Sequence, residues 1–273
     1  MVDFNIIETQ KYFKYIIKNK IGKKRGGEGK GEAEMLFTTR RGGVSEGIYS
    51  SLNMGYSTGD SKANIYNNRA LVLNDFNLSI DKMTSSDQVH GTKLMAVENA
   101  KSDAGECDGL FTASRKVVLS MFFADCAPLF FYDPLNLAAG LSHAGWRGTC
   151  GDIASKSVRF MKERFDSDLS SLIAVIGPSI GSCCFETGEE VAFEFKEKLK
   201  NISVNEYIKA APGRDKFLID LKSVNRELLK AAGLDEKNIF VHDICTACEK
   251  DIFYSYRRDR GDTGRMAALA FII

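Results

Sequence analysis

The segment VVLSMFFA at 117–124 is apolar on both faces of an extended chain, which is typical of a strand buried in the middle of a sheet. This segment therefore restricts the fold to one in which both faces of a β-sheet are packed against other parts of the chain. Periodicity predicts helices at 62–76, 147–166, 187–200 and 219–232. Strands are predicted within 4–20 and at 34–40, 93–97, 116–124, 128–132, 136–143, 171–176, 238–242 and 265–272. Because helices and strands mix without a strict βαβ rhythm, we predict an α+β fold.

The chain shows no internal repeat and no convincing linker, so we predict a single domain over 1–273. A flexible loop is predicted near 23–33, because KKRGGEGKGE at 23–32 contains no apolar residue and several glycines.

Charge and hydropathy exclude several classes of partner. Lys and Arg number 37 against 36 Asp and Glu, and a net charge of +1 gives no electrostatic case for nucleic acid or an anionic membrane. No stretch approaches the roughly 18 apolar residues that a membrane span needs, and charges interrupt the N-terminal segment. We therefore expect a cytoplasmic protein whose seven cysteines are thiols rather than a disulfide framework.

Three short segments each combine a metal-capable side chain with turn residues at a predicted strand end. DQVHGT (87–92), FADCAPL (123–129) and LSHAGWRGT (141–149) supply His90, Cys126 and His143. Two imidazoles and one thiolate with an open fourth position are typical of catalytic zinc. Each residue alone is more often a surface or core residue, and separations of 36 and 17 residues match no compact zinc motif, so both interpretations stay open.

The pair Cys245 and Cys248 forms a C-x-x-C motif, which suggests half of a zinc ribbon or a redox pair. A ribbon needs a second spaced pair, whereas Cys183 and Cys184 are adjacent. We therefore expect these cysteines to be core or pocket-lining thiols.

Arginines near glycine turns are candidates for binding an anion. Arg147 and the backbone amides of 147–150 are expected at the start of a long helix, where phosphate binds well. Arg40, in the glycine turn TTRRGG, is a second candidate. Arg257, Arg258 and Arg265 form a third basic group of candidate arginines. A surface salt bridge is an equally common role for a single arginine.

Taken together, the segments resemble the YfiH-type, or laccase-domain, family, formerly polyphenol oxidase and later assigned as purine nucleoside phosphorylases. The resemblance runs in order from about residue 34 through TTRRGGVSEGIYSSLNMG (38–55), QVHGT (88–92), CDGLFT (107–112), ADCAPL (124–129), HAGWRGT (143–149), IGPSIGSCCFETGEE (176–190), ICTAC (244–248) and SYRRDRGDTGRMAAL (255–269). It implies an α+β layered sandwich of mixed β-sheets flanked by helices, similar to the catalytic domain of cytotoxic necrotizing factors.

The resemblance also implies roles for individual residues. Its metal ligands fall on His90, Cys126 and His143, with zinc the usual metal and copper an alternative. Its catalytic set adds Asp125, and its substrate and phosphate residues fall on Arg40, Asn53 and Arg147. Two departures stand out, because CDGLFT replaces a block that often reads ADAL and the 23–32 loop resembles an insertion.

The implied activity is phosphorolysis of adenosine, inosine or methylthioadenosine, with adenosine deaminase as a side activity. Phosphate would attack C1′, and Asp125 would hold a ligand imidazole or protonate the purine. The expected partners are therefore nucleoside and phosphate, with no nucleic acid and no membrane, and the chain is expected to be a monomer or weak homodimer.

Three alternatives remain. A copper-binding polyphenol oxidase is one, although only His242 would be left for a further copper cluster. A cysteine hydrolase in peptidoglycan editing, with Cys126 as nucleophile and His143 as base, is the second. A non-catalytic metal-stabilised binding module is the third, and an open coordination position argues against it.

Overall fold

Two large mixed sheets and one small sheet make up the β-structure of the computed structural model, which describes residues 2–19, 32–212 and 215–273. The first sheet has the order β1-β2-β3-β16-β8-β4-β6, and its pairings are antiparallel except for β4 with β8 and β6. Its strands are β1 (Val2–Glu8), β2 (Tyr12–Asn19), β3 (Ala33–Thr38), β4 (Met83–Asp87), β6 (Asp103–Glu106), β8 (Val118–Phe123) and β16 (Met266–Ile272).

The second sheet has the order β15-β11-β9-β10-β7-β5, with parallel pairing only at its two ends. Its strands are β5 (Leu94–Ala96), β7 (Gly109–Thr112), β9 (Ala127–Asp133), β10 (Ala138–Ala144), β11 (Ile173–Ile176) and β15 (Ile239–Val241). A three-stranded sheet of order β12-β14-β13 consists of β12 (Glu186–Gly188), β13 (Ile208–Ala210) and β14 (Lys216–Ile219).

The two large sheets pack face to face, because their central strands are apolar on both sides. Met121 and Phe123 of β8 and Ala268 of β16 share one core with Phe130 of β9 and Leu141 of β10. Strand β8 lies between β16 and β4, so the predicted central position of VVLSMFFA is confirmed. Face-to-face packing of two sheets buries both inner faces.

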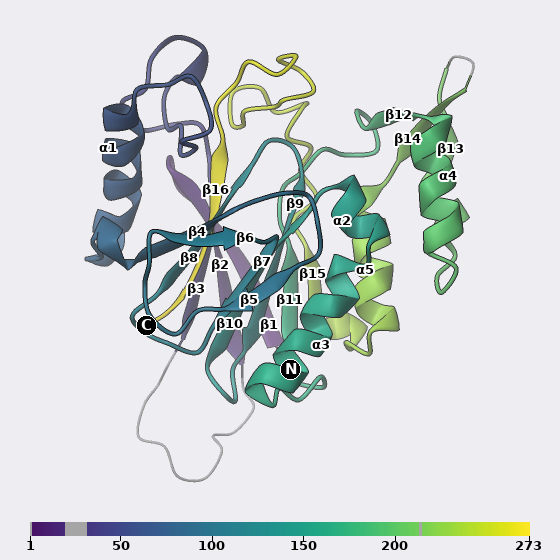
Figure 1. Cartoon of the computed structure of the whole chain (residues 1–273), viewed down its shortest axis with the longest axis horizontal. Helices are drawn as coiled ribbons and strands as arrows, with labels where there is room; N and C mark the ends of the chain where they lie inside the picture. Colours follow the sequence, from purple (N-terminus) through teal and green to yellow (C-terminus); the bar gives the residue numbers. More distant parts are fainter. Residues whose placement is uncertain (1, 20–31, 213–214) are drawn as a thin grey trace.

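Helices cover the two outer faces of this sandwich (Figure 1). Val72 and Leu73 of α1 (Lys62–Leu73) pack on the first sheet. Val158 of α3 and Leu228 of α5 pack on the second sheet. The helices on this side are α2 (Trp146–Cys150), α3 (Ile153–Phe165), α4 (Glu189–Lys198) and α5 (Leu221–Ala231). The predicted α+β layered sandwich is therefore confirmed, while its similarity to the cytotoxic necrotizing factor domain stays a prediction.

Short 3-10 helices complete the secondary structure of the described residues. They are η1 (Gly47–Tyr49), η2 (Asn74–Phe76), η3 (Ile80–Lys82), η4 (Val204–Tyr207) and η5 (Glu236–Asn238). No helix in the described part of the chain combines the length and the hydrophobicity that crossing a bilayer requires.

The predicted helix 147–166 is wrong in one respect, because it is two helices. The chain turns at Asp152, which has a φ of 59° and whose carboxylate accepts the Ser155 N–H to begin α3. Ala154, Val158 and Met161, which share one face of α3, are buried. Gly233, with a φ of 99°, follows α5 in the left-handed conformation that ends many helices.

Other boundaries differ because local patterns are weak there. Residues 186–188 form strand β12, so the helix predicted to begin at 187 begins at Glu189. Strands β4 (MTSSD) and β6 (DAGE) carry too few apolar residues to be found by alternation. Of the flexible loop predicted near 23–33, residues 23–31 lie outside the described residues, and Ala33 already begins β3.

Candidate functional site

The topology brings His90, Cys126 and His143 to one edge of the sandwich. Strands β4 and β8 are parallel, so the chain leaves both at the same edge before His90 and Cys126 respectively. Strand β10 reaches that edge as β9 begins, because His143 is paired opposite Pro128. The sheet register therefore unites residues that are 36 and 17 positions apart.

The ligand atoms of this His–Cys–His trio lie within 4.8 Å of one another. The two imidazole rings meet at 72°, with their centroids 4.8 Å apart. His143 is buried, Cys126 is half-buried and His90 is exposed, with a φ of 59°. A Cβ on Gly145 would lie 3.0 Å from the Cys126 Sγ and 3.2 Å from the His90 ring, so any larger side chain would crowd both trio residues.

Asp108 organises two of the three trio residues. One carboxylate oxygen contacts His143 Nδ1 at 2.8 Å and accepts the His90 N–H at 3.0 Å. The other oxygen accepts the backbone N–H groups of Val89 and Gly91 at 3.3 and 2.7 Å. Because Nδ1 of His143 is engaged by Asp108, its Nε2 is the ring nitrogen left for the other two trio residues or a metal. A carboxylate behind a ligand imidazole fixes its tautomer and orientation.

The side chains of the trio perturb one another's protonation. Burial acts to raise the pKa of the Cys126 thiol, but the adjacent His143 and His90 imidazoles lower it to about 6. Burial acts to lower the pKa of His143, but the Cys126 thiolate and Asp108 raise it to about 9. Burial also opposes ionisation of Asp108, yet hydrogen bonds from His143, Gly91 and His90 hold its pKa below the usual range.

Two imidazoles and a thiol that ionises easily form a donor set that fits zinc. Neutral histidine nitrogen and cysteine thiolate are ordinary zinc ligands, and three protein ligands leave a coordination position for water or substrate. Copper accepts the same donors. The geometry therefore supports a metal site at the trio and does not select the metal.

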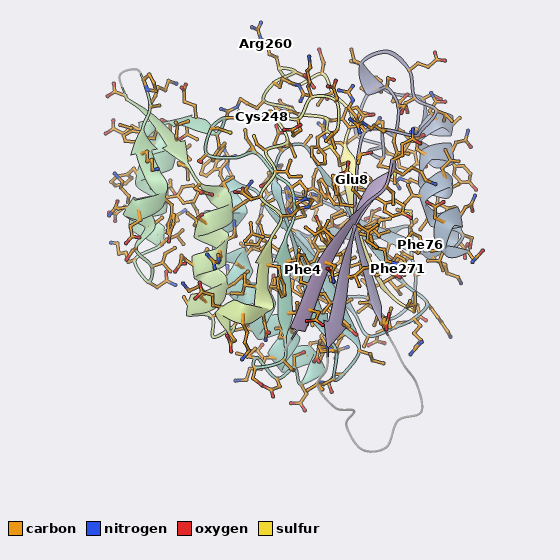
Figure 2. All side chains as sticks on the ribbon, turned by 180° about the vertical axis from the view of Figure 1, so that it is seen from behind. Phe4, Glu8, Phe76, Cys248, Arg260 and Phe271 are labelled. Atoms are coloured by element: carbon orange, nitrogen blue, oxygen red, sulfur yellow. The ribbon has the colours of Figure 1, made fainter. Side chains whose placement is uncertain are left out.

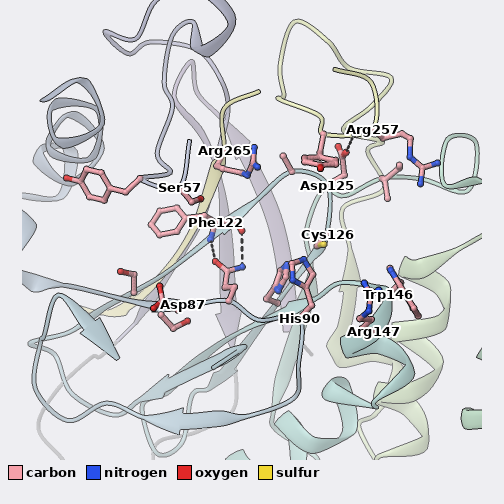
Figure 3. A pocket seen from close by; sticks show the side chains of 18 of the residues that line it. Ser57, Asp87, His90, Phe122, Asp125, Cys126, Trp146, Arg147, Arg257 and Arg265 are labelled. Atoms are coloured by element: carbon pink, nitrogen blue, oxygen red, sulfur yellow. Dashed lines mark hydrogen bonds between the residues drawn. The ribbon is translucent and has the colours of Figure 1, made fainter. Parts of the chain in front are cut away.

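A pocket of about 850 Å³ opens over the trio (Figure 3). Its wall combines aromatic rings, arginines and carboxylates. The aromatic residues are Tyr56, Phe122, Trp146, Phe185 and Tyr256, the arginines are Arg69, Arg147, Arg257 and Arg265, and the carboxylates are Asp87, Asp103 and Asp125. Among the described residues, no carboxylate forms an ion pair with any of these four arginines. The pocket is therefore able to accept an anion beside the trio.

Arg147 lines this pocket, as the anion hypothesis requires. It is exposed, and its guanidinium stacks 4.2 Å from the centre of the Trp146 ring. Arg147 is the second residue of α2, which has only five residues, so the expected position at the start of a long helix is wrong.

Arg40 lies outside the pocket lining. Its guanidinium donates to the carbonyl oxygens of Ser50 and Lys250 at 3.0 Å each and lies over the Tyr254 ring. These contacts tie together two loops, and the structure does not bring Arg40 together with Arg147.

Asn53 is fully buried and reaches the site through Arg265. Its side-chain oxygen accepts the Arg265 N–H at 2.9 Å, and its amide donates to Thr58 and Asp60. Arg265 itself lines the pocket. Asn53 therefore positions a pocket residue rather than lining the pocket.

Asp125 lies in the pocket wall with both carboxylate oxygens engaged. It accepts hydrogen bonds from the hydroxyls of Thr246 and Ser255 and from the Arg257 N–H, at 2.7, 2.9 and 3.0 Å. The expectation that Asp125 holds a ligand imidazole is wrong for His143, whose ring contacts Asp108 instead.

Arg69 is a pocket residue that sequence reasoning missed. It is buried between the rings of Tyr56 and Phe122 and donates twice to the Met54 carbonyl. Burial lowers its pKa to about 10. Its position in α1 gave no signal, because NNRALVL looks like an ordinary amphipathic helix. Of the third basic group, Arg257 and Arg265 line the pocket, whereas Arg258 pairs with Asp259.

The remaining histidine and the C-x-x-C pair lie elsewhere. His242 contacts the Tyr15 hydroxyl at 3.2 Å in the core, where burial lowers its pKa to about 4. It is therefore not part of a second imidazole cluster. Cys245 and Cys248 meet Cys183 and Cys184 in a four-cysteine cluster. Cys245 packs against the core, as predicted, whereas Cys248 is exposed and neither of the two lines the pocket.

The layered fold and the His–Cys–His site define a known class, and the chain belongs to the family described as multi-copper polyphenol oxidoreductase laccase, whose model matches residues 34–273. Within that class it is similar to YfiH- and YlmD-named proteins. Purine nucleoside phosphorylase YlmD of Geobacillus stearothermophilus is 39% identical over 247 residues, covering 86% of this chain and 88% of the relative. Purine nucleoside phosphorylase YlmD of Bacillus subtilis is 36% identical over 241 residues, covering 84% and 85%. The crystal structure of Bacillus licheniformis hypothetical protein YfiH superimposes with a TM-score of 0.84 at 34% identity, covering 88% of this chain and 92% of that one.

Proposed function

We propose that this chain is a zinc-dependent purine nucleoside phosphorylase with adenosine deaminase as a side activity. The observation that carries the proposal is that the trio, several aromatic rings and four arginines share one pocket, and that among the described residues no carboxylate pairs with these arginines. The names of the relatives support it. Phosphate would attack C1′ of adenosine, inosine or methylthioadenosine as the bond from C1′ to the purine nitrogen breaks. The products are the free base and ribose 1-phosphate or its methylthio analogue.

Phosphate recognition is assigned to Arg147 and Arg265. Figure 3 draws them on either side of His90 and Cys126, so an anion between them would lie next to the trio. Guanidinium groups match phosphate oxygens with two parallel hydrogen bonds. The role predicted for Arg40 becomes structural in this proposal, because Arg40 donates to carbonyl groups outside the pocket.

Recognition of the purine is assigned to the aromatic residues of the pocket. Tyr56 and Phe122 already sandwich Arg69, which keeps their rings fixed, and Trp146 stacks with Arg147. Rings of this kind bind a flat base through stacking and apolar contact. The departing purine takes the electron pair of the broken bond and needs a proton. Asp125 is our candidate to pass on this proton, taken from the attacking hydrogen phosphate, because it is the pocket carboxylate adjacent to Cys126.

His90, Cys126 and His143 would hold the metal, with Asp108 fixing the His143 ring. Bound zinc would supply a Lewis acid that stabilises negative charge on substrate oxygens or activates water for deamination. The chain's own residues do the rest: they orient the phosphate, stack the base and exclude bulk water from one side. A lone copper ion in the trio is the alternative metal, whereas a multicopper centre lacks histidines.

A second candidate is a cysteine hydrolase that acts in peptidoglycan editing. The Asp108–His143–Cys126 arrangement favours it, because a carboxylate orients an imidazole beside a thiol whose pKa is lowered to about 6. A nucleophilic cysteine must be free, whereas a ligand cysteine is occupied by metal. Bound zinc should therefore protect Cys126 from alkylation, and a chelator should expose it.

Metal analysis followed by incubation with adenosine and phosphate tests the phosphorylase. We expect adenine with an equal amount of ribose 1-phosphate when phosphate is present, and inosine alone when it is absent. Products that do not depend on phosphate would contradict phosphorolysis. Rapid alkylation of Cys126 while zinc stays bound would favour the hydrolase instead.

Arg147→Ala should raise the KM for phosphate about 10- to 100-fold without changing metal content, because it removes one charged partner of the anion. Arg164→Ala is the matched control, since Arg164 is exposed on α3 and pairs with Glu98 away from the pocket. An equal effect of both variants would remove Arg147 from the anion site. We further expect a cytoplasmic monomer or weak homodimer, which size-exclusion chromatography tests for the oligomeric state.

A further inference from the structure

Four cysteines from two separate loops converge outside the catalytic pocket. Strands β11 and β15 run parallel, so the loops that follow them leave the sheet at the same end. The first loop carries Cys183 and Cys184, and the second carries Cys245 and Cys248. The two loops also pair through their backbones, where Thr246 N–H donates to the Ser179 carbonyl at 3.1 Å.

The sulfur atoms of this four-cysteine cluster all lie within 4.8 Å of one another. Cys248 Sγ is 3.6 Å from Cys183 Sγ and 3.5 Å from Cys184 Sγ, and all four thiols are free. Four sulfurs around zinc, each at about 2.3 Å, stand about 3.8 Å apart at the corners of a tetrahedron. The observed separations therefore leave room for one ion at the centre.

We propose that Cys183, Cys184, Cys245 and Cys248 form a second metal site, a structural zinc site with four thiolate ligands. Four protein ligands close the coordination sphere, which distinguishes a structural site from a catalytic one. The site is separate from the trio, since none of its residues lines the pocket.

The backbone around the cluster is arranged for sulfur ligation. The Gly181 N–H donates to the Cys245 Sγ at 3.2 Å, a contact that stabilises negative charge on sulfur. The chain then turns back, with the N–H groups of Cys184 and Phe185 both donating to the Gly181 carbonyl at 3.0 and 2.9 Å. This tight turn lets adjacent cysteines approach the same point, which their sequence spacing alone did not suggest.

Access and surroundings also fit a metal site. Cys183 and Cys248 are exposed, whereas Cys184 and Cys245 are half-buried, so an ion can enter from solvent. Figure 2 shows Cys248 on the loops at the same end of the molecule as Arg260. Surface thiols this close would otherwise be prone to oxidise, and zinc would protect them.

The proposed ion would fasten one wall of the pocket. Ile180 and Phe185 flank the first cysteine pair and line the pocket. Thr246, inside the C-x-x-C motif, donates its hydroxyl to Asp125, and Arg257 donates to the Cys184 carbonyl at 3.2 Å. Cross-linking the two loops would therefore hold Asp125 and Arg257 in position without contact between the metal and substrate.

The test of the second site is the number of zinc ions per full-length chain, measured in variants that lack either the trio or the four-cysteine cluster. The His90→Ala/Cys126→Ala/His143→Ala variant should retain one zinc per chain after purification under reducing conditions. X-ray absorption of that variant should show sulfur neighbours alone, at about 2.3 Å. The result for this variant does not depend on the proposed function, because the variant lacks the three trio side chains. Wild type should hold two zinc ions if both proposals are right, and one if only the four-cysteine site is real.

Cys183→Ser/Cys248→Ser should lose one zinc per chain, whereas Cys150→Ser, which removes a buried thiol outside both sites, should lose none. Circular dichroism verifies that each variant is folded. If the serine variant fails to fold, the X-ray absorption measurement still decides the question. A reduced, folded trio-less protein that binds no added zinc, or that binds it through nitrogen or oxygen, would overturn the proposal.

Discussion

Replacing Asp108 by asparagine is the sharpest test of how the trio is held. The substitution keeps the size of the side chain and removes its charge. Four donors face the two carboxylate oxygens: the backbone N–H groups of Val89, His90 and Gly91, and Nδ1 of His143. Asparagine has one oxygen and one NH₂ group, so two of these donors must face another donor.

The loss follows from these unmet contacts. Each buried donor left without an acceptor costs about 1–3 kcal/mol, so with two such donors we expect the free energy of unfolding of the metal-free protein to fall by about 2–6 kcal/mol. Removing a carboxylate behind a ligand histidine weakens metal binding about 10- to 100-fold. That corresponds to about 1.4–2.8 kcal/mol of binding free energy.

Zinc affinity is measured by competition with a chelator, and stability by urea unfolding of the metal-free protein. Both are done in the Cys183→Ser/Cys248→Ser background, so that only the trio binds zinc. Asp133→Asn is the matched control, because buried Asp133 accepts the N–H groups of Leu135 and Asn136 away from the pocket. It should lower stability and leave zinc affinity unchanged. Wild-type zinc affinity in Asp108→Asn, or equal weakening in the control, would refute the role of Asp108.

Four further outcomes are expected. Gly145→Ala should weaken zinc binding in the same competition assay, because the alanine Cβ would lie 3.0 Å from the Cys126 Sγ. An unchanged zinc affinity would show that the loop shifts to relieve this contact. In metal-free protein, residue-resolved alkylation of Cys126 should stay fast until the pH falls through about 6, and a midpoint near 9.0 would contradict the pairing with His143. Ionised Cys126 stabilises the metal-free fold fully above pH 9.0, and this stabilisation is lost as the pH falls through about 6. Protonated His143 stabilises it fully below pH 6.5, and that stabilisation is lost as the pH rises through about 9. Because the two effects change in opposite directions, the free energy of unfolding measured in urea should change little between pH 6.5 and 9. Asp152→Ala should lower the free energy of unfolding by about 1–3 kcal/mol and Asp152→Gly by less, because glycine accepts a φ of 59°; equal losses would rule out a backbone contribution.

Most of the sheets and helices could be predicted because their signals are local. The doubly apolar β8 and the stripe of Val158 and Met161 on α3 are visible in any short window of the sequence. The break at Asp152 was not, since its left-handed backbone depends on how α2 and α3 each pack. Polar strands such as β4 are stabilised by neighbours in the sheet rather than by their own composition.

The candidate site was only partly predictable for a related reason. Residue type and turn context singled out His90, Cys126 and His143, and the sheet register brings them together. The contribution of Asp108 depends on contacts with residues 17 to 35 positions away, which no local pattern encodes. The four-cysteine cluster likewise depends on the parallel pairing of β11 with β15, which sequence spacing does not reveal.

The place of β16 in the first sheet has a consequence for synthesis of the chain. This strand pairs with β3 on one side and β8 on the other, although residues 266–272 leave the ribosome after every other strand described here. Until they emerge, β3 and β8 lack the strand that joins them, and the inner face of the sheet cannot close over β9 and β10. The first sheet is therefore completed only once β16 has been synthesised, and the strands that position the trio have apolar faces exposed until then.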